Sequence, residues 1–200
     1  MDNSSSLIQV HIKIKNCPVP VWRRVVIPTS YSLYDLHTVI QTVMGWTNTH
    51  LHGYFIGNVL YVDKLADWED GVDEGYEDER KVIVESLISK LPKQIMYTYD
   101  FGDDWDHEIK FERIVPYKPN VHCPVCVSGK GVCPPEDIGG IWGYERYLYS
   151  LKHPKLKLRR EFDESYYDVD FDPFSIDIEC INNDLINVGK NVSGNTLLNV

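Results

Sequence analysis

Near its N-terminus the chain alternates apolar and polar residues. The apolar positions are Ile8, Val10, Ile12 and Ile14. Such a period of two is typical of a β-strand that buries one face and exposes the other. Residues 21–27 predict a second strand, because the proline-containing turn signal at 17–20 precedes them and Pro28 follows them. The two strands are expected to form a hairpin.

The next periodic segment repeats at the spacing of an α-helix. Its apolar stripe consists of Leu33, Leu36, Ile40 and Val43. Ser32 followed by Asp35 has the spacing of a capping box, in which a hydroxyl and a carboxylate bind free N–H groups at the start of a helix. Gly45 stands where a left-handed residue ends many helices. A helix is therefore predicted over residues 32–44, with its apolar stripe buried.

Two further hairpins are predicted. Residues 50–56 and 59–62 flank Gly57-Asn58, a pair that suits a tight two-residue turn. Residues 95–111 alternate on both sides of Gly102-Asp103-Asp104. This triplet favours a reversal, because Gly adopts positive φ and Asp bonds nearby backbone in turns. The resulting central hairpin carries aromatic, acidic and imidazole side chains close together.

The remaining segments show weaker patterns. Residues 63–80 are acidic and contain glycine, which indicates an exposed loop. Residues 82–91 fit either a short strand or a short helix, and residues 114–140 are expected to be irregular because prolines and cysteines mark them. Two more helices are predicted, one around residues 144–151 and one that begins at Asp172-Pro173.

Together these elements predict an α+β fold. We expect a mixed or antiparallel sheet of hairpins, one helix that crosses it and a helical C-terminal region over one edge, an arrangement like the β-grasp. The sequence has no internal repeat or low-complexity linker. It therefore predicts one domain over residues 7–187, with flexible termini at 1–6 and 188–200.

Composition narrows the cellular setting. The 200 residues are 43% hydrophobic, which is enough for the core of one ordinary domain. The chain lacks a long apolar run and residues 1–6 lack the features of a secretion signal, so we expect a cytoplasmic protein without a membrane partner. Five cysteines, an odd number, favour free thiols or metal ligands over a disulfide framework.

The formal charge of −10 disfavours nucleic acid as a partner, because it repels polyphosphate at long range. A nucleic-acid-binding surface would need segregated basic groups. Arg23, Arg24 and the run of residues 152–160 are the candidates. The alternative is that this run, like the acidic residues 63–79, is solvated surface.

Five short motifs follow one another along the chain. They are Pro20-Val21-Trp22-Arg23-Arg24, Met44-Gly45-Trp46 with His50-Leu51-His52, Tyr99-Asp100-Phe101-Gly102-Asp103-Asp104-Trp105 with His107, Cys133-Pro134-Pro135-Glu136-Asp137 with Gly139-Gly140 and Gly143-Tyr144, and Phe171-Asp172-Pro173. In this order they resemble the plasmid pRiA4b Orf-3-like family. The resemblance implies a compact α+β domain. It also implies an association with mobile elements, because relatives in this family are labelled TnpR-type passenger proteins of insertion elements. A serine resolvase would need an arginine-flanked nucleophilic serine and a DNA-reading helix-turn-helix, and the sequence shows neither.

Histidines and aspartates of two hairpins are candidates for a catalytic metal site. His50 and His52 are two residues apart, so on a strand both imidazoles would share one face. With His107 and either Asp103 or Asp104 they could hold a divalent ion that activates water. The alternative is that His107 is a core histidine and that the two aspartates only stabilise the turn.

The cysteines suggest a separate structural zinc site. Cys123 and Cys126 have the CxxC spacing that lets two thiolates reach one ion, and Cys133 offers a third sulfur. His122 or a distant side chain would have to supply the fourth ligand. The alternative is a group of small buried or surface thiols without metal.

Glu136 and Asp137 follow two prolines and precede two glycines. They could form an acid/base pair on a rigid loop, but capping of the following helix is the favoured interpretation.

Three functions remain open. The first is a small intracellular binding or accessory protein, stabilised by zinc, that acts on an unidentified protein or small-molecule ligand through a groove near the central hairpin. The second is a metal-dependent hydrolase or nuclease-like enzyme that uses the histidine and aspartate cluster. The third is a nucleic-acid-binding module.

Overall fold

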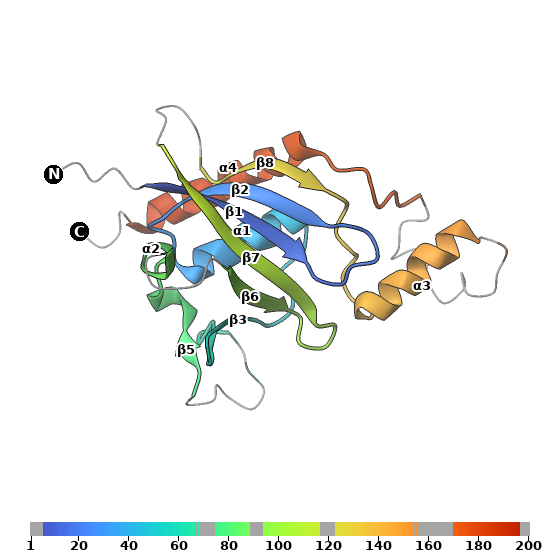
Figure 1. Ribbon diagram of the computed structural model, residues 1–200, viewed down its shortest axis with the longest axis horizontal. Helices are drawn as coiled ribbons and strands as arrows, with labels where there is room; N and C mark the ends of the chain where they lie inside the picture. Colours follow the sequence, from blue (N-terminus) through green and yellow to red (C-terminus); the bar gives the residue numbers. More distant parts are fainter. Residues whose placement is uncertain are drawn as a thin grey trace.

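A single sheet of eight strands forms the body of the protein (Figure 1). The structure is a computed structural model, which describes residues 6–66, 68, 75–88, 94–116, 123–153, 155 and 170–196. The strands are β1 (Leu7–Ile14), β2 (Trp22–Pro28), β3 (His52–Ile56), β4 (Val59–Val62), β5 (Glu77–Asp78), β6 (Gln94–Tyr99), β7 (Trp105–Val115) and β8 (Val125–Lys130). They lie in the order β5-β4-β3-β6-β7-β1-β2-β8. Neighbours pair antiparallel except β4 and β5, which pair parallel. The α+β prediction with a mixed sheet of hairpins is confirmed.

Helices cover one face of the sheet and extend beyond it. They are α1 (Leu33–Met44), the 3-10 turn η1 (Glu79–Lys81), α2 (Val84–Ile88), α3 (Gly140–Lys152) and α4 (Ile178–Thr196). In Figure 1, α1 crosses behind the strands, α4 runs along β8, and α3 stands to one side of the sheet. None of the helices in the described part of the chain combines the length and apolar character needed to cross a bilayer.

The predicted helix over residues 32–44 forms as α1, with the expected local chemistry at both ends. Ser32 and Asp35 make a reciprocal capping box, and Gly45 ends the helix at φ 85°. Leu36 and Ile40 are fully buried against the sheet. Each such side chain contributes about 1.5–3 kcal/mol by leaving water, which holds α1 across the strands.

The three predicted hairpins also form. β1 pairs with β2, β3 with β4, and β6 with β7. In the central hairpin Tyr97 lies opposite His107, and both side chains are completely buried on the face that α1 covers. The second hairpin starts later than predicted, because β3 begins at His52 and His50 lies in the loop before it.

Residues 82–91 fitted either a short strand or a short helix, and the structure has the short helix α2 in this segment. Two other segments differ from the expectations. The segment expected to be irregular contains β8, an edge strand whose backbone pairs with β2 although its sequence hardly alternates. The last helix begins at Ile178 instead of Asp172, because the Asp172 carboxylate accepts a hydrogen bond from the Phe174 amide in a turn. This helix continues to Thr196, beyond the predicted domain end.

Candidate metal centre

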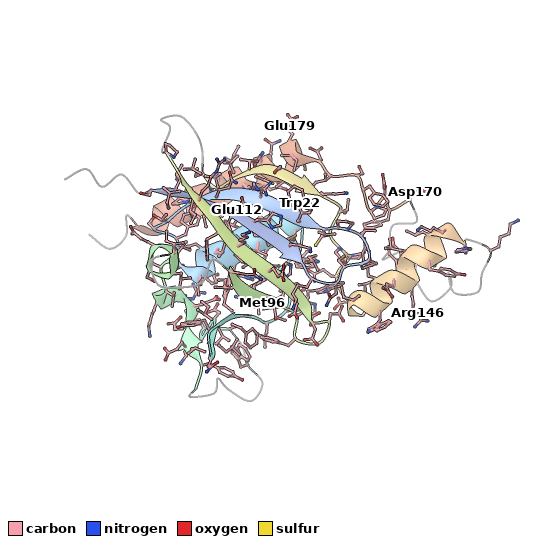
Figure 2. The ribbon with its side chains drawn as sticks, in the orientation of Figure 1. Trp22, Met96, Glu112, Arg146, Asp170 and Glu179 are labelled. Carbon is pink, nitrogen blue, oxygen red and sulfur yellow. The ribbon has the colours of Figure 1, made fainter. Side chains whose placement is uncertain are left out.

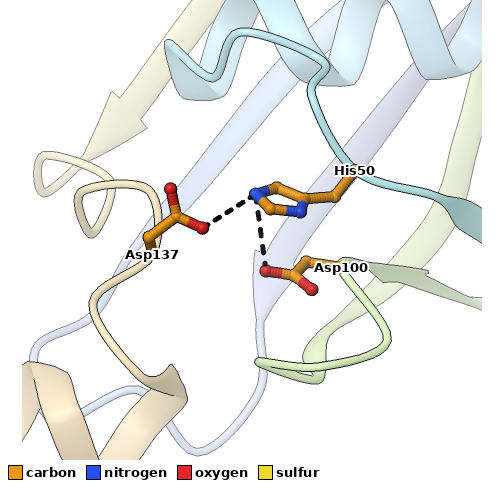
Figure 3. Close-up of side chains that lie close together, drawn as sticks. All are labelled: His50, Asp100 and Asp137. Carbon is orange, nitrogen blue, oxygen red and sulfur yellow. Dashed lines mark ion pairs between the residues drawn. The ribbon is translucent and has the colours of Figure 1, made fainter.

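Three loops converge on the imidazole of His50 (Figure 3). One is the loop between α1 and β3, the second is the turn between β6 and β7, and the third is the loop that leads into α3. His50 Nε2 lies 3.1 Å from Asp137 Oδ1 and 3.8 Å from both Asp100 Oδ2 and Glu136 Oε2. His50, Asp100 and Asp137 each present one potential ligand atom, and these three atoms lie within 4.8 Å of one another. The arrangement is a compact set of one nitrogen and two oxygen donors.

The turn geometry directs Asp100 toward His50. Asp100 adopts a left-handed conformation with φ 56°. Its Oδ1 accepts hydrogen bonds from the Gly102 and Asp103 amides at 2.9 and 3.3 Å, as Asp side chains do in turns. Its backbone N–H donates to the Leu51 carbonyl, which ties the turn to the loop that carries His50. Oδ2 is the oxygen that faces the histidine.

Glu136 joins the third loop to the first. Its Oε1 accepts hydrogen bonds from the Thr47 amide at 2.8 Å, the Thr47 hydroxyl at 3.1 Å and the Tyr99 hydroxyl at 3.2 Å. Burial raises the pKa of Tyr99 to about 12, so this phenol stays protonated and donates. Trp46 Nε1 donates to the Pro134 carbonyl nearby. Glu136 therefore fixes the position of its neighbour Asp137 rather than capping a helix.

Asp103 holds the loop of Asp137 from the other side. Its Oδ2 accepts a hydrogen bond from the Gly139 amide at 3.0 Å. Gly140 has φ 64°, and a Cβ there would lie 2.6 Å from the Asp103 carbonyl oxygen, so the close approach requires glycine. Asp104, at φ 53°, donates its N–H to the Asp100 carbonyl. Both aspartates thus stabilise the turn, as the alternative interpretation held, and neither is in the donor set around His50.

His52 belongs to a different, buried cluster. Its Nε2 lies 3.0 Å from both carboxyl oxygens of Glu79, and its ring stacks on His37 at 3.4 Å between centroids. Burial lowers the pKa of His52 to about 4 and raises the pKa of Glu79 to about 8. Both pKa shifts fit a protonated Glu79 that donates a hydrogen bond to a neutral His52. His37 completes the cluster, with Tyr97 OH at 2.8 Å from Nδ1 and Asn48 Oδ1 at 2.8 Å from Nε2.

Sequence reasoning missed Glu79 and His37. Glu79 lies in the acidic segment interpreted as an exposed loop, but it is completely buried. His37 lies four residues after Leu33 and three before Ile40, so it occupies the apolar stripe of α1. A polar residue at a buried helical position was the available signal for this cluster.

His107 is a core histidine. It is completely buried in β7, and its ring contacts Trp46 and Tyr97 at centroid distances of 5.4 and 5.3 Å. Neither ring nitrogen makes a hydrogen bond to the described residues. Burial lowers the pKa of His107 to about 4, although nearby carbonyl groups of Trp105 and Tyr97 oppose this shift. Because β6 lies between β3 and β7, the structure does not bring the three predicted imidazoles into one site.

The three thiols of the predicted zinc site differ in their burial. Cys126 in β8 and Cys133 are buried, Cys123 is half-buried, and burial raises the pKa of all three. In the described part of the chain, the group that brings three His, Cys, Asp or Glu ligand atoms together is His50, Asp100 and Asp137, not the cysteines. His122 lies outside the described residues.

The structure describes only some of the basic residues that were candidates for binding nucleic acid. Arg23 is 2% exposed and its Nε donates to the Val43 carbonyl at 2.7 Å, so it is a core arginine. Arg24 binds both oxygens of Glu112 at 2.8 and 2.9 Å. Both guanidinium groups are therefore bound to other groups of the protein and are not directed at a phosphate. Of residues 152–160, Lys152, His153 and Lys155 are described and the others lie outside the described residues.

The protein is an α+β domain with an eight-stranded sheet, and three of its loops bring one histidine and two aspartates together. The chain belongs to the family of Plasmid pRiA4b ORF-3-like proteins, which it matches over residues 6–180. It is 34% identical over 179 residues to the uncharacterized protein y4hQ of Sinorhizobium fredii (strain NBRC 101917 / NGR234), covering 89% of this chain and 90% of that one. It is also similar to the crystal structure of a protein of unknown function, MM3350, from Methanosarcina mazei Go1, with a TM-score of 0.75 and 31% identity over 87% of this chain and 96% of the other.

Proposed function

We propose that the protein binds a divalent metal ion at His50, Asp100 and Asp137 and uses it to hydrolyse a substrate. The supporting observation is the meeting of three potential ligand atoms within 4.8 Å, each contributed by a different loop. His50 Nε2 is shielded from solvent and makes no hydrogen bond within the described residues, although carboxylates lie nearby. An imidazole nitrogen in this setting is a suitable metal ligand.

The donor set indicates the class of metal and chemistry. One imidazole and two carboxylates suit zinc, manganese or ferrous iron better than soft-ligand metals. Three protein ligands leave positions for water, and a bound ion lowers the pKa of such a water so that it can act as a nucleophile near neutral pH. Glu136 Oε2 lies 3.8 Å from His50 Nε2, so Glu136 would be close enough to the centre to accept a proton from such a water.

The support around the centre fits this role. Glu136 and Asp103 hold the loop of Asp137 from two sides, and the backbone bond from Asp100 to Leu51 holds the other two loops together. Such supporting hydrogen bonds orient metal ligands, and their loss typically weakens metal binding about 10–100-fold. The half-buried His50 and exposed Asp137 leave the centre open to a substrate on one side.

Metal binding provides the first test. Protein stripped with EDTA should bind about one Zn²⁺ or Mn²⁺ per chain by calorimetry, and at a ligand concentration of 100 Kd its free energy of unfolding should rise by about 2.7 kcal/mol. His50→Ala and Asp137→Asn should reduce the affinity at least 10-fold, because each removes one of three ligands. His153→Ala, an exposed histidine elsewhere, is the matched control.

The outcomes separate three interpretations. Equal affinity in the wild type and in His50→Ala would overturn the proposal, and so would the absence of stoichiometric metal, which would leave the cluster as contacts between His50 and its neighbouring carboxylates. Metal retained in His50→Ala but lost in Cys126→Ala would place the ion at the cysteines instead. Metal-dependent hydrolysis of bis-p-nitrophenyl phosphate that His50→Ala abolishes is the expected activity.

A further inference from the structure

The exposed face of α3 carries aromatic side chains that nothing in the described structure covers. Trp142 is 79% exposed and Tyr149 is 50% exposed. The opposite face of the helix is anchored, because Tyr144 and Tyr147 are buried and contact Phe171. The helix is therefore held by one face and presents the other to solvent.

The exposed residues form one row. Trp142, Arg146, Tyr149 and His153 follow one another at steps of four, three and four residues, so they lie on the same side of the helix. We call this set the α3 row. At the helical rise it extends about 16 Å. It alternates a large aromatic ring with a cationic or imidazole side chain.

The end of the row is ordered by its own contacts. The rings of Tyr149 and His153 stack at 4.1 Å between centroids with 27° between their planes. His153 Nδ1 lies 2.9 Å from the Tyr149 carbonyl oxygen, which is one turn earlier in the helix. A stacked pair that is already in place loses little freedom when a further flat ring joins it.

Charge is distributed unevenly over the chain, in a way that favours an anionic partner at α3. The acidic residues Glu77 and Asp78 form β5, which Figure 1 shows at the lower left of the view, away from α3 at the right. Arg146 is exposed on α3, where Figure 2 labels it. Lys152 and Lys155 are exposed at its C-terminal end, against one acidic residue on the helix, Glu145. The net charge of −10 therefore does not describe this surface.

We propose that the α3 row binds single-stranded nucleic acid, with bases stacked on Trp142 and Tyr149 and phosphates paired with Arg146 and Lys152. Aromatic rings interleaved with cationic groups are what single strands require, because every base has a flat face and every linkage a charge. The chemistry is sequence-tolerant and needs no metal. The inference therefore goes beyond the proposed metal centre and does not depend on it.

The position of α3 connects the two proposals. Asp137 lies three residues before the first residue of the helix, and the Gly139 amide is bound to Asp103 beside the centre. A strand that follows the row toward the N-terminal end of α3 thus approaches the donor set. Phosphodiester is the substrate class that this placement indicates for the hydrolytic site.

Binding is measured with fluorescein-labelled oligo(dT) of about 20 nucleotides, by anisotropy in EDTA and 50 mM salt, so that the metal centre plays no part. Wild type should bind with quenching of Trp142 emission. Trp142→Ala should weaken the affinity at least 5-fold, the lower end of the loss expected for one stacked base. Trp142→Phe should recover most of it, and Phe174→Ala, another exposed aromatic, should bind as wild type.

Charge provides a second readout. Arg146→Ala should weaken binding and flatten the dependence of log affinity on log salt by about 0.7, the value for one phosphate contact on a single strand. Glu145→Gln should tighten binding. Circular dichroism confirms that each variant is folded. Equal affinity of Trp142→Ala and wild type overturns the proposal, and so does absence of binding by wild type. Self-association that Trp142→Ala abolishes, without oligonucleotide binding, would assign the row to a second copy of the chain.

Discussion

Two histidines that are two residues apart occupy opposite environments. His50 lies in a loop, where its Nε2 is shielded from solvent beside three carboxylates while 27% of the side chain stays exposed. His52 lies in β3, where it is 6% exposed and its Nε2 is hydrogen-bonded to Glu79. The first arrangement has the geometry to receive a cation from solution, whereas the second satisfies its polar atoms internally. Burial, more than residue type, decides which histidine is available for chemistry.

A third histidine sharpens the contrast. His107 is as buried as any residue in the protein but has no hydrogen-bond partner within the described residues. The three side chains therefore represent an open donor, a satisfied buried pair and an unsatisfied buried ring. Each should respond differently to substitution.

Removal of Glu79 should have the largest effect. Glu79→Ala creates a cavity beside His52 and leaves its Nε2 without a partner, so the free energy of unfolding should fall by about 2–4 kcal/mol. Glu79→Gln keeps a donor for His52 and should cost less than about 1 kcal/mol. Urea denaturation measures both. Equal losses in the two variants would show that the hydrogen bond to His52 contributes nothing and that only the volume matters.

Leucine substitutions compare the two buried rings directly. His52→Leu leaves the Glu79 carboxyl group without its partner and should lower the free energy of unfolding by about 1–3 kcal/mol. His107→Leu removes two nitrogens that make no hydrogen bonds, so it should be neutral or stabilising. Thermal and urea unfolding of the two variants give the comparison. A larger loss for His107→Leu than for His52→Leu would contradict it.

The smallest expected effect is the pH dependence of stability that Glu79 and His52 produce. The pKa of Glu79 is raised to about 8, so the folded state holds a proton that the unfolded state releases, and stability falls as pH rises toward 8. The pKa of His52 is lowered to about 4, so its contribution rises with pH and is complete once the pH exceeds the ordinary value for histidine. The two slopes oppose each other below that value.

Above an ordinary histidine pKa of about 6.5 the fall from Glu79 should remain alone, at no more than about 1.4 kcal/mol per pH unit. Urea denaturation at pH 6.5, 7.25 and 8 measures the slope. Glu79→Gln should abolish it, because glutamine does not titrate. A slope that persists in this variant would assign the pH dependence to other groups.

Local chemistry accounts for what could be predicted from the sequence. The capping box of Ser32 with Asp35, the left-handed Gly45 and the alternation around Gly102 each depend on residues within a few positions of one another. β8 was not predicted because an edge strand can form from backbone pairing alone, with little alternation in its side chains. The start of β3 was predicted two residues too early, so His50 was expected in a strand but lies in a loop.

The sequence by itself determined the helix across the sheet, the hairpins and the turn residues, because these follow from spacing and from backbone preferences of short segments. Only the tertiary structure decided which carboxylates meet His50. The order of strands places β6 between His52 and His107, and it brings the loop of Asp137 onto the turn of Asp100. Contacts between loops distant in the sequence depend on how the whole sheet assembles, and no local pattern encodes them.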